Sequence, residues 1–134
     1  MVNAETPFQV LYVSQLAPGS DFGVVKEIVT VSRLRNPARG ISGVLLFDGE
    51  RFGQLIEGAE ADVQALLRSI EGDPRHTGVR VLFAGPSDTG RVMQRWASGY
   101  CDVSELEPFH AAVGLRDRAA LDAFVTVLKG ADIE

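Results

Sequence analysis

The apolar residues of this chain change from strand-like runs to helical spacing several times. Residues 8–14 form an apolar run that predicts a first strand. After a predicted cap at Ser20, two apolar stripes recur every three or four residues over 21–34, which predicts a helix covered on more than one side. Residues 44–47 and 52–56 flank a turn with glycine and predict a β-hairpin.

The second half of the chain alternates in the same way. Apolar positions over 63–70 follow the i, i+3, i+4, i+7 pattern of an amphipathic helix, and strands are predicted over 79–84 and 96–103. The resulting order is β-α-β-β-α-β with an added strand. We therefore expect an α+β fold with a ferredoxin-like sheet and two helices on one of its faces.

The pattern favours one main domain followed by an appendage. We expect the domain over residues 1–103 and a short helical extension over 104–134 that packs on the sheet. The 134 residues, 46% of them hydrophobic, suffice for a single core.

Charge and cysteine content narrow the partners. Thirteen Lys and Arg residues are scattered among eighteen Asp and Glu residues, with a net charge of −5, so we expect no nucleic-acid partner. No leader or membrane-spanning stretch is apparent, which predicts a cytoplasmic protein without a membrane partner. Cys101 is the single cysteine, so we expect a buried, inert thiol, no internal disulfide and no metal site.

Three hydrogen-bonding residues are placed so that they can meet around one ligand. Tyr12 lies in the first strand, Asn36 follows the first predicted helix, and Gln54 lies in the second strand of the hairpin. The segments around them, together with residues 73–76, resemble the BLUF family of flavin-binding blue-light sensors from about residue 8 to residue 103.

The resemblance implies a photoreceptor rather than an enzyme, with noncovalently bound FAD, or FMN as a possibility. It implies that Tyr12 donates an electron and a proton to the excited flavin and that Gln54 switches the hydrogen bonds between them. A glutamine amide can do this because one end donates and the other accepts. Taken alone, Tyr12 is more typical of a core residue and Gln54 of an exposed strand residue.

The resemblance also implies how the flavin is held. The Asn36 amide would bind the edge of the ring, although an Asn before a Pro also commonly ends a helix. The other implied contacts could equally be ordinary core residues or a helix-end turn. They are Arg35 beside Asn36, Ile28 and Ile70 on the two ring faces, and Asp73, Arg75 and His76 after the second helix.

Trp96 and Ser98 are the residues that the resemblance links to signal output. Relatives commonly carry a methionine two residues after the tryptophan, and this chain has Ser98 there. A single tryptophan is otherwise more often a core anchor. The departure at Ser98 leaves the outward relay open but does not bear on flavin binding; at the binding residues, Arg35 stands where many relatives carry Asn or His.

We expect the signal to pass to a separate downstream protein or through a homo-oligomer, because the chain carries no fused effector. Two alternatives stay open. One is a light-insensitive flavin-binding or protein-interaction module, and the other is a small ferredoxin-like hydrolase. The hydrolase has little support, because no phosphate-binding loop, paired carboxylates or nucleophile with an adjacent base is evident.

Overall fold

A computed structural model describes residues 6–111 and 114–134 of the protein. In these residues one sheet of six strands has the order β4-β1-β3-β2-β5-β6. β5 runs parallel to β2, and every other neighbouring pair is antiparallel. The elements are β1 (Phe8–Leu16), α1 (Phe22–Ala38), β2 (Ser42–Phe47), β3 (Arg51–Gly58), α2 (Glu60–Glu71), β4 (His76–Pro86), β5 (Trp96–Tyr100), α3 (Val103–His110), α4 (Asp117–Gly130) and β6 (Asp132–Ile133).

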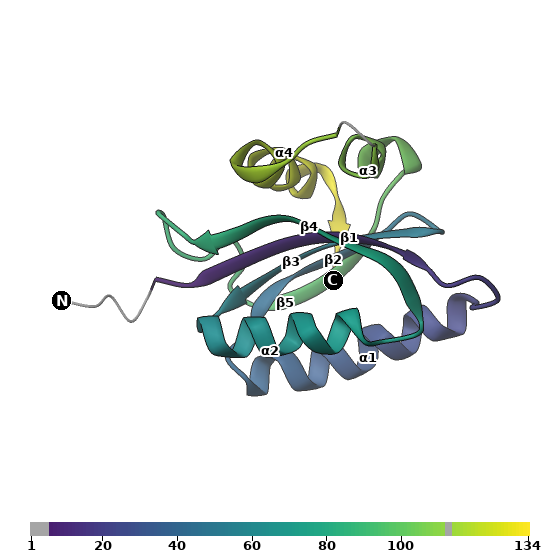
Figure 1. Ribbon diagram of the computed structural model, residues 1–134, viewed down its shortest axis with the longest axis horizontal. Helices are drawn as coiled ribbons and strands as arrows, with labels where there is room; N and C mark the ends of the chain where they lie inside the picture. The colour runs from purple at the N-terminus through teal and green to yellow at the C-terminus, as the bar shows by residue number, and fades with distance from the viewer. Residues whose placement is uncertain (1–5, 112–113) are drawn as a thin grey trace.

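The elements form three layers. α1 and α2 lie side by side on one face of the sheet, and α3 and α4 lie on the other face (Figure 1). The first four strands have the order β4-β1-β3-β2, and β5 and β6 extend the sheet beyond β2. The predicted α+β fold with a ferredoxin-like sheet is therefore confirmed.

Coverage on both faces explains why the central strands show no alternation of apolar and polar residues. All six residues of β2 and the last seven of β3 are buried. Successive side chains still point to opposite faces. Leu45 and Phe47 thus pack with α1 in one core cluster, while Val44 and Leu46 pack in another with residues of α3 and α4.

Both ends of α1 differ from the prediction. The helix begins after Asp21, whose side chain accepts a backbone N–H, rather than after Ser20. It continues to Ala38, so Asn36 lies in its last turn and not after it. Pro37 lacks a backbone donor, but the carbonyl groups of this turn receive the N–H groups of the residues that follow. An Asn-Pro pair near a helix end therefore did not end the helix here.

The last two strands of the prediction also have different limits. β4 is longer at both ends than 79–84. β5 ends before Val103, because Asp102 and Glu105 form a capping box that starts α3 at that residue. The appendage thus begins as a helix one residue earlier than predicted, and its last residues add β6 to the sheet.

Cys101 is partly exposed rather than buried. Desolvation and the nearby Glu105 carboxylate raise the pKa of its thiol to about 12. The thiol is therefore protonated at neutral pH, which agrees with an inert side chain.

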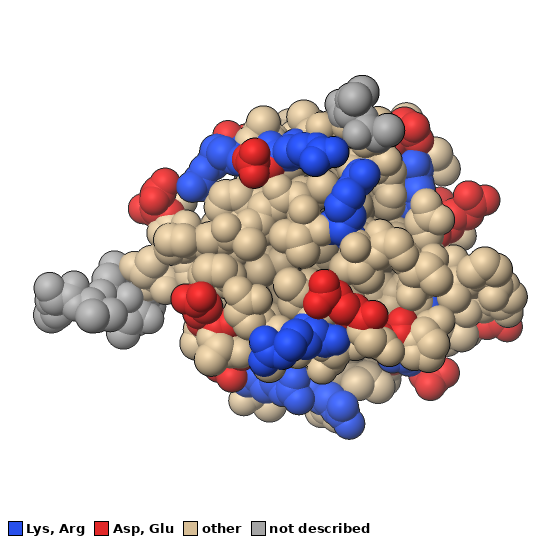
Figure 2. All heavy atoms as spheres, viewed as in Figure 1, with Lys and Arg blue, Asp and Glu red and all other residues tan. Residues whose placement is uncertain are grey.

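The surface mixes charges of both signs. On the face shown in Figure 2, the Lys and Arg side chains are interspersed with Asp and Glu side chains. Across residues 6–111 and 114–134, no helix combines the length and the apolar character that crossing a bilayer requires.

Candidate functional site

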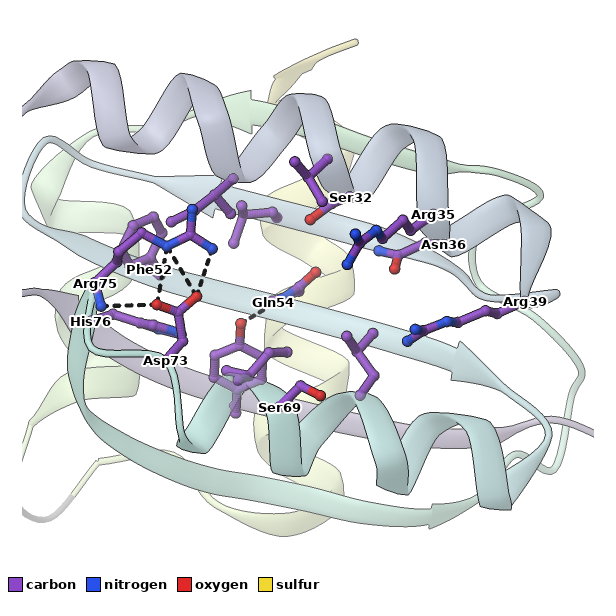
Figure 3. Close-up of a pocket in the computed structure, with 16 residues that line it drawn as sticks. Ser32, Arg35, Asn36, Arg39, Phe52, Gln54, Ser69, Asp73, Arg75 and His76 are labelled. Carbon is purple, nitrogen blue, oxygen red and sulfur yellow. Dashed lines mark hydrogen bonds and ion pairs between the residues drawn. The ribbon is translucent and has the colours of Figure 1, made fainter.

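A cavity lies between α1 and α2 above the sheet (Figure 3). Its walls come from six elements (β1, α1, β2, β3, α2 and β4) and from the turn between α2 and β4. Nine of the predicted site residues line it, from Tyr12 on β1 to His76 at the start of β4, which brings together side chains far apart in the chain. The nine are Tyr12, Ile28, Arg35, Asn36, Gln54, Ile70, Asp73, Arg75 and His76.

Gln54 lies at the centre of a buried hydrogen-bond chain. It is the direct cross-strand partner of Tyr12. Its Nε2 donates to the Tyr12 hydroxyl, and its Oε1 accepts from Trp96 Nε1 at 3.1 Å. An indole nitrogen can only donate, so the oxygen of the amide must face Trp96. The chemistry of Trp96 thus fixes which end of the Gln54 amide faces Tyr12.

Tyr12 is protonated, and its hydroxyl hydrogen is available for a further hydrogen bond. Its side chain is 2% exposed, and desolvation raises the pKa of the phenol far above its ordinary value. The hydroxyl accepts from Gln54, so its own hydrogen can still be donated. A ligand acceptor in the cavity is a suitable partner for this hydrogen.

Asn36 offers a second set of groups to a ligand. Its side chain is 3% exposed and points into the cavity from the last turn of α1 (Figure 3). Within the described parts of the chain, no hydrogen bond joins its amide to another side chain of the cavity, so both ends of the amide are available to a ligand (Figure 3). The amide can donate and accept at once, as the imide edge of an isoalloxazine requires. The polar residues of the cavity therefore fit a flavin ring.

Apolar and basic side chains complete the walls. The half-buried Ile28 on α1 and Ile70 on α2 come from the two helices that flank the cavity. Arg35 on α1 and Arg39, which directly follows α1, are exposed and lie at the end of the cavity beyond Gln54 (Figure 3). This arrangement supplies apolar surface for a flat ring and positive charge for an anionic chain attached to it.

An ion pair stiffens the turn between α2 and β4. Arg75 donates from Nε and Nη2 to the Asp73 carboxylate, at distances of 2.7–3.1 Å. The Arg75 hydrogen bond is the main reason that the pKa of Asp73 lies below its usual range. The next residue, His76, shares a hydrogen bond of 3.0 Å with Ser14 through Nδ1. The turn therefore presents a fixed set of polar groups to the cavity.

His76 should make stability depend on pH. Burial lowers the pKa of its ring below 6.5; Asp73 raises it in part, and Arg75 lowers it further. Between about pH 7 and pH 5, the unfolded chain therefore takes up a proton before the folded one, and stability falls as the pH falls. His76→Gln should reduce this loss in urea unfolding of the purified protein. His110→Gln provides the comparison, because burial lowers the pKa of His110 as well. An unchanged pH slope in His76→Gln would refute the assignment.

The two predicted output residues lie outside the cavity. Trp96 is 2% exposed and packs with residues of α1, β2 and β3, as a core anchor would, but it also contacts Gln54. Ser98 lies in the same cross-strand row as Gln54, with Leu45 between them. Its Oγ accepts from Arg33 Nη2 at 2.9 Å. Only Trp96 thus touches the switch directly.

Seven further residues line the cavity that the sequence prediction did not include. Helical spacing could have found Val31, Ser32, Arg39 and Leu66, since each lies three or four residues from Ile28, Arg35 or Ile70, whereas Ser69 lies directly before Ile70. The two-residue period of strands could have found Phe52, two residues before Gln54. Leu45 could not be found without the register of β2 and β3. The seven are Val31, Ser32, Arg39, Leu45, Phe52, Leu66 and Ser69.

Comparison with known proteins places this geometry in a family. The family model described as sensors of blue light using FAD matches residues 8–99. The photoactivated adenylate cyclase subunit alpha of Euglena gracilis is 41% identical over 70 residues, which are 52% of this chain and 7% of that protein. The chain thus spans only a small part of the curated relatives that it matches.

Solved structures show the same fold. The dark-state structure of BlrB, a BLUF protein, has a TM-score of 0.77 at 23% identity and covers 96% of this chain and 98% of its own. Klebsiella pneumoniae BlrP1 with FMN and cyclic diGMP has a TM-score of 0.66 at 26% identity, covering 90% of this chain and 34% of its own. A family model that spans most of the sheet and both helices around the cavity establishes the assignment: the chain belongs to the BLUF family of blue-light sensors that use FAD.

Proposed function

We propose that this chain holds FAD between α1 and α2 and converts blue light into a change of hydrogen bonds around Gln54. The hydrogen-bond chain Tyr12–Gln54–Trp96 at the cavity wall is the observation that carries the proposal. When bound, the flavin supplies the absorption of blue light and an electron acceptor. FMN has the same ring, so the groups that face the ring accept either cofactor.

The roles of the binding residues follow from their positions. Asn36 would hold the imide edge of the ring with its side-chain amide, and Ile28 and Ile70 would pack against the two ring faces. Arg35 would lie at the rim, where it can contact the ring or the attached chain. The Asp73–Arg75 pair and His76 would close the side of the cavity at the start of β4.

The chemistry of this chain begins at Tyr12. Its protonated phenol can give up an electron and the Oη proton together and can later take both back, so that nothing is consumed. Burial favours coupled transfer, because a phenolate or a phenol cation alone would be a charge in an apolar site. Gln54 is hydrogen-bonded to this hydroxyl and also lines the cavity, so its amide would respond to the loss and return of the Oη proton.

Rotation of the Gln54 amide would exchange its two ends. Oε1 would then face the Tyr12 hydroxyl, which can donate to it, while Nε2 would face Trp96 Nε1. Two donors cannot share a hydrogen bond, so the buried indole would lose its partner, at a cost of about 1–3 kcal/mol. This cost favours the return of the amide in darkness. The hydrogen bond of Trp96 would thus be lost when the amide rotates, and its loss would favour the return of the amide.

The signal would leave the site along β5. Trp96 is the first residue of this strand, and Tyr100 at its other end stacks on Phe22 of α1 with a ring separation of 5.8 Å. Phe22, Tyr100 and the following Val103 are each more than half exposed, at 51%, 56% and 56%. An apolar surface of this kind suits contact with a downstream protein or a second copy of the chain.

The visible absorption spectrum in darkness, after blue illumination and during recovery tests the proposal. We expect a flavin spectrum that shifts slightly to longer wavelength in light and returns in darkness. A bound flavin without a shift would leave a light-insensitive binding module. A colourless protein that cannot be loaded with FAD or FMN would contradict flavin binding itself.

A further inference from the structure

A carboxylate is buried on the sheet face opposite the cavity. Glu57 on β3 is 0% exposed, and its cross-strand neighbours are Gln9 on β1 and Ser42 on β2. It lies three residues after Gln54, so the two side chains point to opposite faces of the sheet. Burial of a carboxylate costs free energy unless hydrogen bonds replace its water.

Four donors surround the two oxygens of Glu57. Gln9 Nε2 donates to Oε2 at 2.8 Å, and Ser42 Oγ donates to Oε1 at 3.3 Å. The backbone N–H of Val92 donates to Oε2 at 2.7 Å, and that of Met93 donates to Oε1 at 2.9 Å. Each oxygen thus accepts one backbone N–H from the segment that joins β4 to β5. To accept from both backbone N–H groups in this way, a side chain needs two acceptor oxygens and no donor, as a carboxylate has.

The held segment leads directly into Trp96. Arg95 lies between the contact at Met93 and the first residue of β5, and its carbonyl accepts from Gly43 of β2 at 3.2 Å. β5 has only five residues, and its outer neighbour β6 has only two. The position of Trp96 therefore depends strongly on how the segment before it is anchored.

We propose that Glu57 is a positioning residue for the light switch. By holding Val92 and Met93 on one face of the sheet, it keeps the Trp96 indole within hydrogen-bond distance of Gln54 on the other. Trp96 in turn fixes the orientation of the amide in darkness. The inference rests on the proposed role of Gln54, and it goes beyond that role by adding a residue that touches neither the cavity nor Gln54.

Glu57→Gln tests the contact with little change in shape. The amide has one acceptor oxygen, and its NH2 end would replace the oxygen that now accepts from one of the two backbone N–H groups, so that two donors would face each other. We expect the holoprotein to keep its flavin and the Trp96 indole hydrogen to exchange with D2O in darkness about 2–10 times faster, as the weakening of one hydrogen bond predicts. Trp96 is the single tryptophan, so its indole signal in a ¹H–¹⁵N NMR spectrum is unambiguous.

A matched variant separates this effect from a general loss of stability. Leu106→Val removes one methylene group from the core on the same face of the sheet, from a side chain that packs near Gly53. It should lower stability and leave the indole exchange close to that of the wild type. If both variants speed the exchange in proportion to their loss of stability, Glu57 is only a structural residue and the proposal is overturned.

A double-mutant cycle then tests whether Glu57 acts through Trp96. Glu57→Gln should change the rate constant of dark recovery in the same direction as Trp96→Phe, and it should have no further effect in the Trp96→Phe background. An equal effect in both backgrounds would overturn the proposal. Should Glu57→Gln not fold, Ser42→Ala removes one donor and should change indole exchange in the same direction by a smaller factor. The exchange needs no photochemistry, so it decides the role of Glu57 even if the wild type fails to respond to light.

Discussion

Replacing Gln54 with leucine should give a protein that remains yellow but no longer responds to blue light. Leucine keeps much of the apolar volume of the side chain but has neither end of the amide. In the resting protein Gln54 makes hydrogen bonds to the Tyr12 hydroxyl and the Trp96 indole. Without the amide, these hydrogen bonds are absent and cannot be rearranged by light. Absorption spectra before and after illumination measure the result. We expect a flavin spectrum with no light-induced shift.

The same variant should be less stable. The Trp96 indole N–H, in a side chain that is 2% exposed, would be left without its acceptor, at a cost of about 1–3 kcal/mol. The matched control is Gln15→Leu, the same change at an exposed position of β1. It should retain the complete light response. A normal light-induced shift in Gln54→Leu would refute the amide switch.

Much of the sheet was predictable because hydrophobic spacing is set locally. The hairpin of β2 and β3 and the amphipathic helix α2 follow directly from runs and periods of apolar residues. The first helix was harder to delimit, because the competing signals of Asn36 and Pro37 favour an end that the tertiary structure does not adopt. Local propensity does not decide where a helix ends when packing and capping of the last turn compensate for an unfavourable residue.

The site was predictable where a residue lies on a recognisable segment and faces a predictable direction. Tyr12, Asn36 and Gln54 meet these conditions, and the structure brings all three to one cavity. The contact between Trp96 and Gln54 is different in kind. It requires β5 to lie parallel to β2 in a specific register, and nothing in the local sequence of either strand sets that register.

The burial of Glu57 is even harder to predict from the sequence than the contact between Trp96 and Gln54. An acidic residue near the end of a strand usually lies in solvent, and no neighbour in the sequence indicates that this one is buried. Its partners are Gln9, Ser42 and two backbone groups more than thirty residues away in the chain. Only the assembled sheet shows that a carboxylate is required there.

Replacing Gly43 with alanine should be among the most destabilising single changes in this protein. Gly43 has a φ of +145°, and a Cβ at this position would overlap the carbonyl oxygen of Leu55 on β3. The unfavourable φ costs about 1–2 kcal/mol and the forced separation of β2 from β3 about 1–3 kcal/mol more. We therefore expect a loss of about 3 kcal/mol or more in the free energy of unfolding, measured by urea denaturation.

Gly49→Ala separates the two contributions. Gly49 also has a positive φ, +107°, but a Cβ there would meet nothing within 4 Å. This control should lose only about 1–2 kcal/mol, the cost of the backbone conformation. Equal losses in the two variants would show that β2 and β3 can separate freely at Gly43. A larger loss for Gly43→Ala would mean that the close approach of these strands is required for stability. The position of Trp96 would then depend on the same approach, because Gly43 is the cross-strand partner of Trp96.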